Sequence, residues 1–227
     1  MWNDRAFRRL ALTLIAYAVA MAYLESAVVV YLNGALGGRV GEIFPIKPVI
    51  EADELAAIEL GRELATLVMI AAIGLLVGRT PVERLAWSSV VFGAWDIAYY
   101  GWLYVFAGWP ASLATVDLLF LLPVPWAGPV WSPLAVSVAL VAFGLAAAAR
   151  VRAGGTIRLA RWHVLAGLAG GLLVILSYTL DTANLIGGGL PGPYPWPVFL
   201  AGMLLALAAA FDALRARSRG RNRARSG

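Results

Sequence analysis

The sequence predicts an all-α integral membrane protein, a single-domain bundle of six transmembrane helices. Hydrophobic residues make up 61% of the 227 residues and charged residues only 14%, a composition too apolar for a soluble domain of this size. Six apolar stretches each approach the ~20 residues that a helix needs to cross a ~30 Å hydrocarbon core. Helices are expected because backbone exposed to lipid must satisfy its own hydrogen bonds.

The spans are expected at about 10–32, 55–77, 85–107, 133–149, 163–186 and 197–214, within one transmembrane domain over 1–214. The first run follows three arginines and is too long for the apolar core of a signal peptide, so we interpret it as a span. No alternation typical of a β-barrel competes with this prediction.

The basic residues predict the orientation. Nearly all of the 18 lysines and arginines fall near the two termini or in the connections 78–84 and 150–161, on one side of the predicted bundle. Arg39 and Lys47 fall on the other side, and Arg62 lies within a span. By the positive-inside rule, both termini are cytoplasmic and the protein is a multi-pass protein of the plasma (inner) membrane.

The C-terminal tail, 215–227, carries an arginine at every second position from 215 to 225. Such a basic, low-complexity segment is typically disordered and is attracted to anionic lipid headgroups on the cytoplasmic side. The net charge of +5 is therefore explained by membrane lipids as partners, and we expect no nucleic-acid partner.

The connection at about 110–130 is apolar almost throughout, which is unusual for a loop in water. Pro110 can open a short helix that ends before Pro123. We therefore expect an interfacial or re-entrant segment here. A lid over a site and a simple interfacial helix are both open interpretations.

The carboxylates within the predicted spans are the strongest indication of a functional site. Ionisable groups inside spans are costly and usually mark a site, and a rise of ~1.5 Å per residue places five acids in the outer half of the bilayer. These acids come from four helices and are Glu25, Glu59, Glu63, Asp96 and Asp181. Arg62 can neutralise only one of them, so protons, water or a metal ion must compensate the others.

Ligand chemistry favours a hard divalent cation. The chain has no cysteine and a single histidine, and carboxylate-only ligation suits Mg, Mn, Ca or Fe. The expected ligands are the five acids of the outer half. The ion would be transported, or would serve an outer-leaflet reaction on a lipid-like or small-molecule substrate, with Asp96, Tyr100 and Arg62 as catalytic residues.

Three other interpretations are open, and whether the protein is an enzyme stays undecided. One is a metal-independent acid/base enzyme acting on a lipid-like substrate. Another is a non-catalytic subunit or assembly factor, oligomeric or bound to a partner through the apolar segment 108–132. The third is a polar network that only joins helices, with Arg62 paired to Glu59 or Glu63 and tyrosine hydroxyls satisfying the aspartates.

Two further patterns concern helix faces. Ser177, Asp181 and Asn184 recur at i, i+4 and i+7 and form one polar stripe on the fifth span. Gly167 and Gly171 form a small-residue pair that permits close packing of that span.

Short motifs suggest a family. The residues Trp95 to Tyr100 read W-D-x-x-Y-Y, the residues Pro123 to Trp126 read P-V-P-W, and Glu59 to Glu63 read E-L-G-R-E. With these motifs the chain resembles a family of uncharacterised bacterial multi-pass membrane proteins, over most of the region from Glu25 to Pro133. That family has no established activity, so the resemblance implies none.

Overall fold

The computed structural model describes residues 4–35, 53–187, 189 and 191–216. Six of its helical segments are long and apolar enough to cross a membrane. They are α1 (Asp4–Ala35), α3 (Asp53–Val77), α4 (Pro81–Ala107), α5 (Trp131–Arg152), α6 (Arg161–Thr179), which the short α7 (Thr182–Ile186) continues, and α8 (Trp196–Arg215). The prediction of six helices that are long and apolar enough to cross a membrane is confirmed, while most of the tail 215–227 lies outside the described residues.

Helix α4 is central to the first part of the bundle, because it packs against α1, α3 and α5. Small residues permit these close approaches. Ala18 and Ala22 of α1 are fully buried. A Cβ added to Gly93 of α4 would lie only 2.4 Å from the carbonyl oxygen of Ser137 in α5. The α4 and α5 backbones are therefore almost in contact, which determines where the polar side chains of both helices meet.

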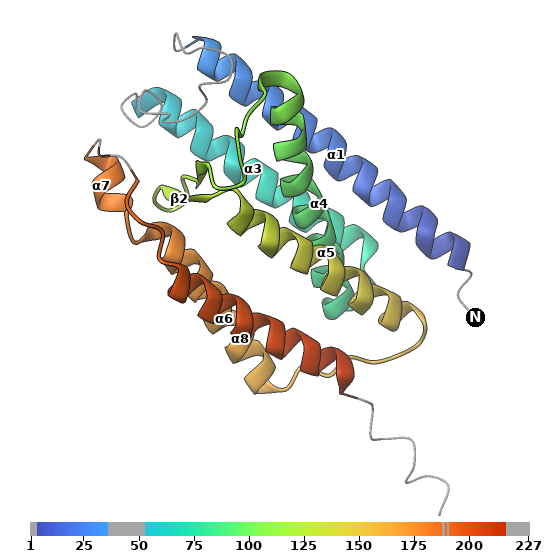
Figure 1. The fold of residues 1–227 in the computed structure, drawn as a ribbon. Coiled ribbons are helices and arrows are strands. Elements are labelled where there is room, and N and C mark those ends of the chain that lie inside the picture. The colour runs from blue at the N-terminus through green and yellow to red at the C-terminus, as the bar shows by residue number, and fades with distance from the viewer. Residues whose placement is uncertain (1–3, 36–52, 188, 190, 217–227) are drawn as a thin grey trace, which may run out of the picture.

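Helices α6 and α8 form a separate pair (Figure 1). A Cβ on Gly170 would lie 2.7 Å from the carbonyl oxygen of Gly202, and the reverse distance is also 2.7 Å. Gly167 and Gly171 have nothing within 4 Å of such a Cβ. The close approach predicted for those two glycines therefore occurs instead at Gly170, on a different face of the same helix.

The segment 110–130 folds as a β-hairpin, so the predicted short helix is wrong. Strands β1 (Val116–Phe120) and β2 (Trp126–Pro129) pair antiparallel. Pro123 and Pro125, which lie between them, cannot donate hydrogen bonds to a continuing helix. The hairpin satisfies much of its backbone by pairing the two strands with each other.

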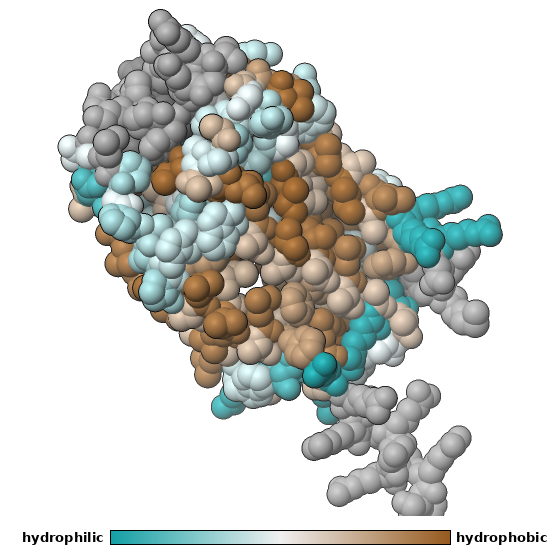
Figure 2. Space-filling model, viewed as in Figure 1, coloured by the Kyte–Doolittle hydropathy of each residue, from teal (hydrophilic) through white to brown (hydrophobic). Residues whose placement is uncertain are grey.

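The two ends of the bundle differ in character. One, the termini end, holds the start of α1 and the end of α8; the other, the hairpin end, holds the β-hairpin and α7 (Figure 1). On the face shown in Figure 2, a broad hydrophobic band separates strongly hydrophilic residues at the termini end from paler residues at the hairpin end. Leucines such as Leu76 and Leu204 are largely exposed, as expected of side chains that face lipid.

A buried ion pair joins the helices at the termini end. Glu83 of α4 is fully buried and pairs with Arg152 of α5. It also accepts hydrogen bonds from Trp87 Nε1 at 3.2 Å and from the Arg79 backbone N–H at 2.9 Å. Arg152 is one of the basic residues in the connection 150–161 that predict the orientation, and in the structure it also connects α5 to α4.

Candidate functional site

The hairpin end holds a group of polar side chains that we call the polar centre. Helix α4 packs between α1 and α3, and the hairpin folds against the same region. The polar centre consists of Glu25, Glu59, Arg62, Glu63, Asp96, Tyr100 and Asp117. Six of these seven residues lie on three helices, and the seventh lies on strand β1.

Arg62 bridges two of the carboxylates. Its Nη1 lies 2.7 Å from Glu25 Oε1 on α1, and its Nε lies 3.0 Å from both carboxylate oxygens of Glu59. Trp95 Nε1 donates to the second oxygen of Glu25 at 2.8 Å. The guanidinium therefore binds two acids from different helices, an arrangement that suits its planar fork of donors. Of the two pairings predicted for Arg62 in a joining network, the one with Glu59 is present.

Glu63 has a different kind of partner. It is 5% exposed, and its carboxylate oxygens accept the backbone N–H of Leu121 at 2.9 and 3.0 Å. Leu121 follows strand β1 directly. The carboxylate therefore satisfies a buried backbone donor that the hairpin ladder leaves without a strand partner, and it attaches the hairpin to α3.

Two aspartates are held by hydroxyl groups. Asp96 of α4 accepts from Ser137 Oγ of α5 at 2.8 Å, at the point where Gly93 lets the two helices approach. Asp117 of β1 accepts from Tyr100 Oη at 3.0 Å and from the Leu118 backbone N–H at 2.8 Å. Both carboxyl groups therefore depend on uncharged donors.

Charge in the polar centre is unbalanced. It contains five carboxyl groups and one guanidinium, and electrostatic interactions connect Glu25 to Asp96 and Asp96 to Asp117. Asp117 is 3% exposed, and burial raises its pKa from 3.8 to about 7, because a low-dielectric environment disfavours the ionised form. This carboxyl group can therefore exchange a proton near neutral pH.

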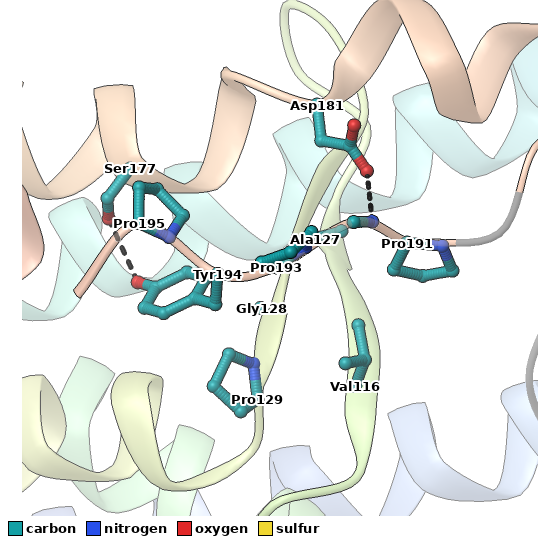
Figure 3. A pocket seen from close by; sticks show the side chains of 11 residues that line it. Val116, Ala127, Gly128, Pro129, Ser177, Asp181, Pro191, Pro193, Tyr194 and Pro195 are labelled. Carbon is teal, nitrogen blue, oxygen red and sulfur yellow. Dashed lines mark hydrogen bonds between the residues drawn. The ribbon is translucent and has the colours of Figure 1, made fainter.

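Asp181 lies elsewhere. It follows α6 and accepts hydrogen bonds from the Gly192 backbone N–H at 2.8 Å and from Asn184 Nδ2 at 3.2 Å. It lines a pocket between the hairpin, the end of α6 and the residues that precede α8 (Figure 3). The structure thus separates Asp181 from the four other acids predicted as metal ligands.

Those four acids are close enough to interact but do not converge. Within residues 4–35, 53–187, 189 and 191–216, no group of three or more Asp, Glu or His side chains has the geometry to hold a metal ion. Each carboxyl group instead faces a hydrogen-bond donor of the protein. The metal site stays a prediction, and it would require these side chains to rearrange.

Asp117 is the member of the polar centre that sequence reasoning missed. It lies in the apolar connection at about 110–130 and is the one charged residue between Trp109 and Trp131. A single acid in so apolar a stretch indicates a site residue, and this is the sequence feature by which Asp117 can be found. Its partner Tyr100 was predicted as a site residue, but the hydrogen bond that joins them depends on the hairpin.

Fold and site together define an integral membrane protein of six apolar helices with a polar centre at one end of the bundle. Comparison of the chain with protein-family models, with curated proteins and with solved structures finds no match in any of the three. The family resemblance suggested by the W-D-x-x-Y-Y and P-V-P-W motifs therefore stays a prediction.

Proposed function

We propose that this protein is a membrane enzyme whose polar centre performs acid/base chemistry, without a metal, on a lipid-like substrate. One observation carries the proposal. Glu63, Asp96 and Asp117 are held by uncharged donors, whereas Arg62, the cation that the described residues bring to this site, is already bound to Glu25 and Glu59. Carboxyl groups in such surroundings exchange protons instead of forming permanent ion pairs.

Different surroundings suit different roles in proton transfer. Asp117 titrates near neutral pH, where a general acid or base is most effective. Asp96 lies close enough to interact with it electrostatically, so a proton on one of the two changes the affinity of the other for a proton. Tyr100 orients Asp117 through its hydroxyl group. Asp117 and Asp96 would therefore act as the coupled acid and base, with Tyr100 as a positioning residue.

The location supports a lipid-like substrate. The polar centre occupies the hairpin ends of the spans, and the hairpin that covers it is largely apolar, with leucines and Phe120 in β1. A substrate with an apolar tail could approach from the bilayer, while a polar end reaches the carboxyl groups. By the positive-inside rule, this end faces away from the cytoplasm.

The experiment uses the full-length protein in lipid nanodiscs that contain a natural lipid extract. Mass spectrometry of the lipids before and after incubation should show a conversion that depends on pH and persists in the presence of a chelator. Asp117→Asn and Asp96→Asn should each abolish it, whereas Asp212→Asn, a matched change of an exposed aspartate at the termini end, should not. A conversion that survives both substitutions would contradict the proposal.

Infrared titration gives a readout that does not need the substrate. The carbonyl band of a protonated carboxylic acid should disappear as the pH rises through about 7, and Asp117→Asn should remove this component. A spectrum in which Asp117→Asn changes nothing over this range would show that the site does not exchange a proton there.

A divalent cation is the second candidate, and the imbalance of five carboxyl groups against one guanidinium favours it. Elemental analysis of the protein extracted in native lipid particles, beside a Glu59→Gln/Glu63→Gln variant, tests it. A metal present in the wild type and lost in the folded variant would support ion binding. Absence of metal from both folded proteins would remove this candidate.

A further inference from the structure

Tyr99 of α4 lies beside the polar centre but is not one of its seven residues. It comes directly before Tyr100, and the two rings meet edge to face with their centroids 5.2 Å apart. The backbone carbonyl of Tyr99 accepts the hydroxyl group of Ser26 at 3.1 Å, and Ser26 follows Glu25 on α1. Tyr99 therefore lies next to both the hairpin side and the α1 side of the polar centre.

The hydroxyl group of Tyr99 has charged neighbours but no hydrogen bond. The charged groups that act on it come from three elements and are Asp117, Glu25, Arg62 and Glu59. It makes no hydrogen bond with any residue that the structure describes, whereas the hydroxyl group of Tyr100 donates to Asp117. Tyrosine hydroxyl groups that are withdrawn from water usually have a partner. The O–H bond of Tyr99 is therefore available to a ligand.

The other side-chain donors of this region already bind carboxyl groups. Arg62 binds Glu25 and Glu59, and Tyr100 donates to a carboxylate of the hairpin. The hydroxyl group of Ser137 likewise donates to a carboxylate. Tyr99 differs from these donors, because a ligand can accept its O–H bond without displacing a contact of the protein.

The charge of the polar centre restricts the polar end of such a ligand. Arg62 contributes one positive charge and its partners Glu25 and Glu59 contribute two negative ones, so this group carries a net charge of −1. Asp96 and Asp117 add negative charge whenever they are ionised. A phosphate or carboxylate group would therefore be repelled, whereas an uncharged hydroxyl or carbonyl group would not.

We infer that the polar centre binds lipids whose polar end is an uncharged oxygen group, as in a diacylglycerol, and that the hydroxyl group of Tyr99 donates a hydrogen bond to this oxygen. The inference rests on the proposed function and narrows its lipid-like substrate to neutral lipids. Val29 and Val30 of α1 pack in the same apolar cluster as Tyr99, so an acyl chain that enters here has apolar neighbours. Tyr99 is then a substrate-binding residue, distinct from the aspartates that transfer the proton.

A displacement experiment with the full-length protein in detergent micelles tests the choice of lipid. Isotope-labelled diacylglycerol is bound first, and native mass spectrometry follows its release when unlabelled lipid is added. Unlabelled diacylglycerol should displace it, whereas phosphatidic acid with the same acyl chains should compete about tenfold less well. Equal competition by the two lipids would overturn the inference, as would failure of diacylglycerol to bind. Anionic lipid attracted to the arginines at the termini end does not affect this readout, because only the labelled lipid is followed.

Tyr99→Phe tests the hydrogen bond. It removes one oxygen atom that no described residue binds, so the melting temperature should not change, while the affinity for diacylglycerol should fall about tenfold. Tyr104→Phe is the matched control, because Tyr104 lies on the same helix and is 64% exposed, and this variant should keep the affinity. An unchanged affinity in Tyr99→Phe would overturn the inference, and so would an equal loss in the two variants.

Glu59→Gln tests the role of charge. It makes the group of Glu25, Glu59 and Arg62 electrically neutral, while Arg62 keeps Glu25 as its partner. Phosphatidic acid should then compete several times better than it does with the wild type. Competition that does not improve would overturn the charge selection.

Activity separates this inference from the acid/base chemistry proposed for the same site. If diacylglycerol binding depends on Tyr99 but no lipid is converted, the inference is supported and the proposed enzyme is contradicted. If wild type and Tyr99→Phe convert a lipid with the same KM, the proposed enzyme is supported and the inference is overturned.

Discussion

The carboxylate of Glu63 on α3 accepts the backbone N–H of Leu121, 58 positions later in the sequence, with both of its oxygens within 3.0 Å. A membrane-embedded acid thus serves as the hydrogen-bond partner of a hairpin that has no further strand beside it among the described residues. The arrangement joins the placement of the hairpin to the chemistry of the polar centre, since Asp117 lies in the same hairpin.

Glu63 is expected to hold the hairpin in place. Glu63→Ala removes the acceptor and leaves a buried N–H without a partner, which should cost about 1–3 kcal/mol. Hydrogen exchange should show the Leu121 amide losing protection in this variant. Glu63→Gln keeps an acceptor oxygen and should retain most of that protection. Equal loss in both variants would indicate that charge, not the hydrogen bond, attaches the hairpin.

Arg62 is expected to stabilise the contact between α1 and α3. Arg62→Ala leaves the carboxylates of Glu25 and Glu59, which are only 12% and 15% exposed, without their cation. Loss of one partner of a buried ion pair typically costs about 3–5 kcal/mol. Thermal unfolding in nanodiscs should show a large decrease in the melting temperature.

A second substitution should rescue part of that loss. Combining Arg62→Ala with Glu25→Gln removes one of the two uncompensated charges, so the double variant should be more stable than Arg62→Ala alone. Arg62→Lys should fall between wild type and Arg62→Ala, because it keeps the charge but loses the planar fork. A double variant less stable than Arg62→Ala would show that Glu25 acts through another contact.

Asp117 is expected to make stability depend on pH. Its folded-state pKa, about 7, lies above the unfolded value of 3.8, so the folded protein binds the proton more tightly. This contribution is fully present below pH 3.8 and is lost as the pH rises through 7. Its size is on the order of a few kcal/mol. Asp117→Asn should flatten the dependence between these limits, as measured by chemical unfolding across pH. A slope of the same size in the variant would assign the dependence to another group.

The α6–α8 contact is expected to be sensitive to a single methyl group. Gly170→Ala places a Cβ against the backbone oxygen of Gly202, which should destabilise the pair by about 1–3 kcal/mol through overpacking. Gly171→Ala is the matched control, because its Cβ meets nothing within 4 Å. Thermal unfolding of the two variants should therefore separate them. Equal stability of both would indicate that the helices adjust their separation freely.

Hydropathy and charge along the chain were sufficient to predict the number of membrane-crossing helices and the acids that enter them. A membrane span can be recognised from its own residues alone, because its length and composition must match the thickness of the bilayer whichever helices it packs against. The sequence also predicts that Glu25, Arg62 and Asp96 lie in the same half of the bilayer, because the depth of a residue follows from its position along its helix. The positive-inside rule likewise uses only sequence position: the basic residues gather in alternate connections and near both termini, which predicts the side of the membrane on which the termini lie.

Only the tertiary structure decided which acids meet. The hairpin brings Asp117 to Tyr100 and Leu121 to Glu63. The sequence of the hairpin segment does not predict these partners, because they lie on helices far from it in the sequence. The sequence predicts for Asp181 a depth similar to that of the other acids, but Asp181 lies apart from them, because the close approach of Gly170 and Gly202 makes α6 and α8 a separate pair. The depth of a residue is a property of its own helix, whereas the residues around it depend on how the helices pack. The polar centre depends on that packing.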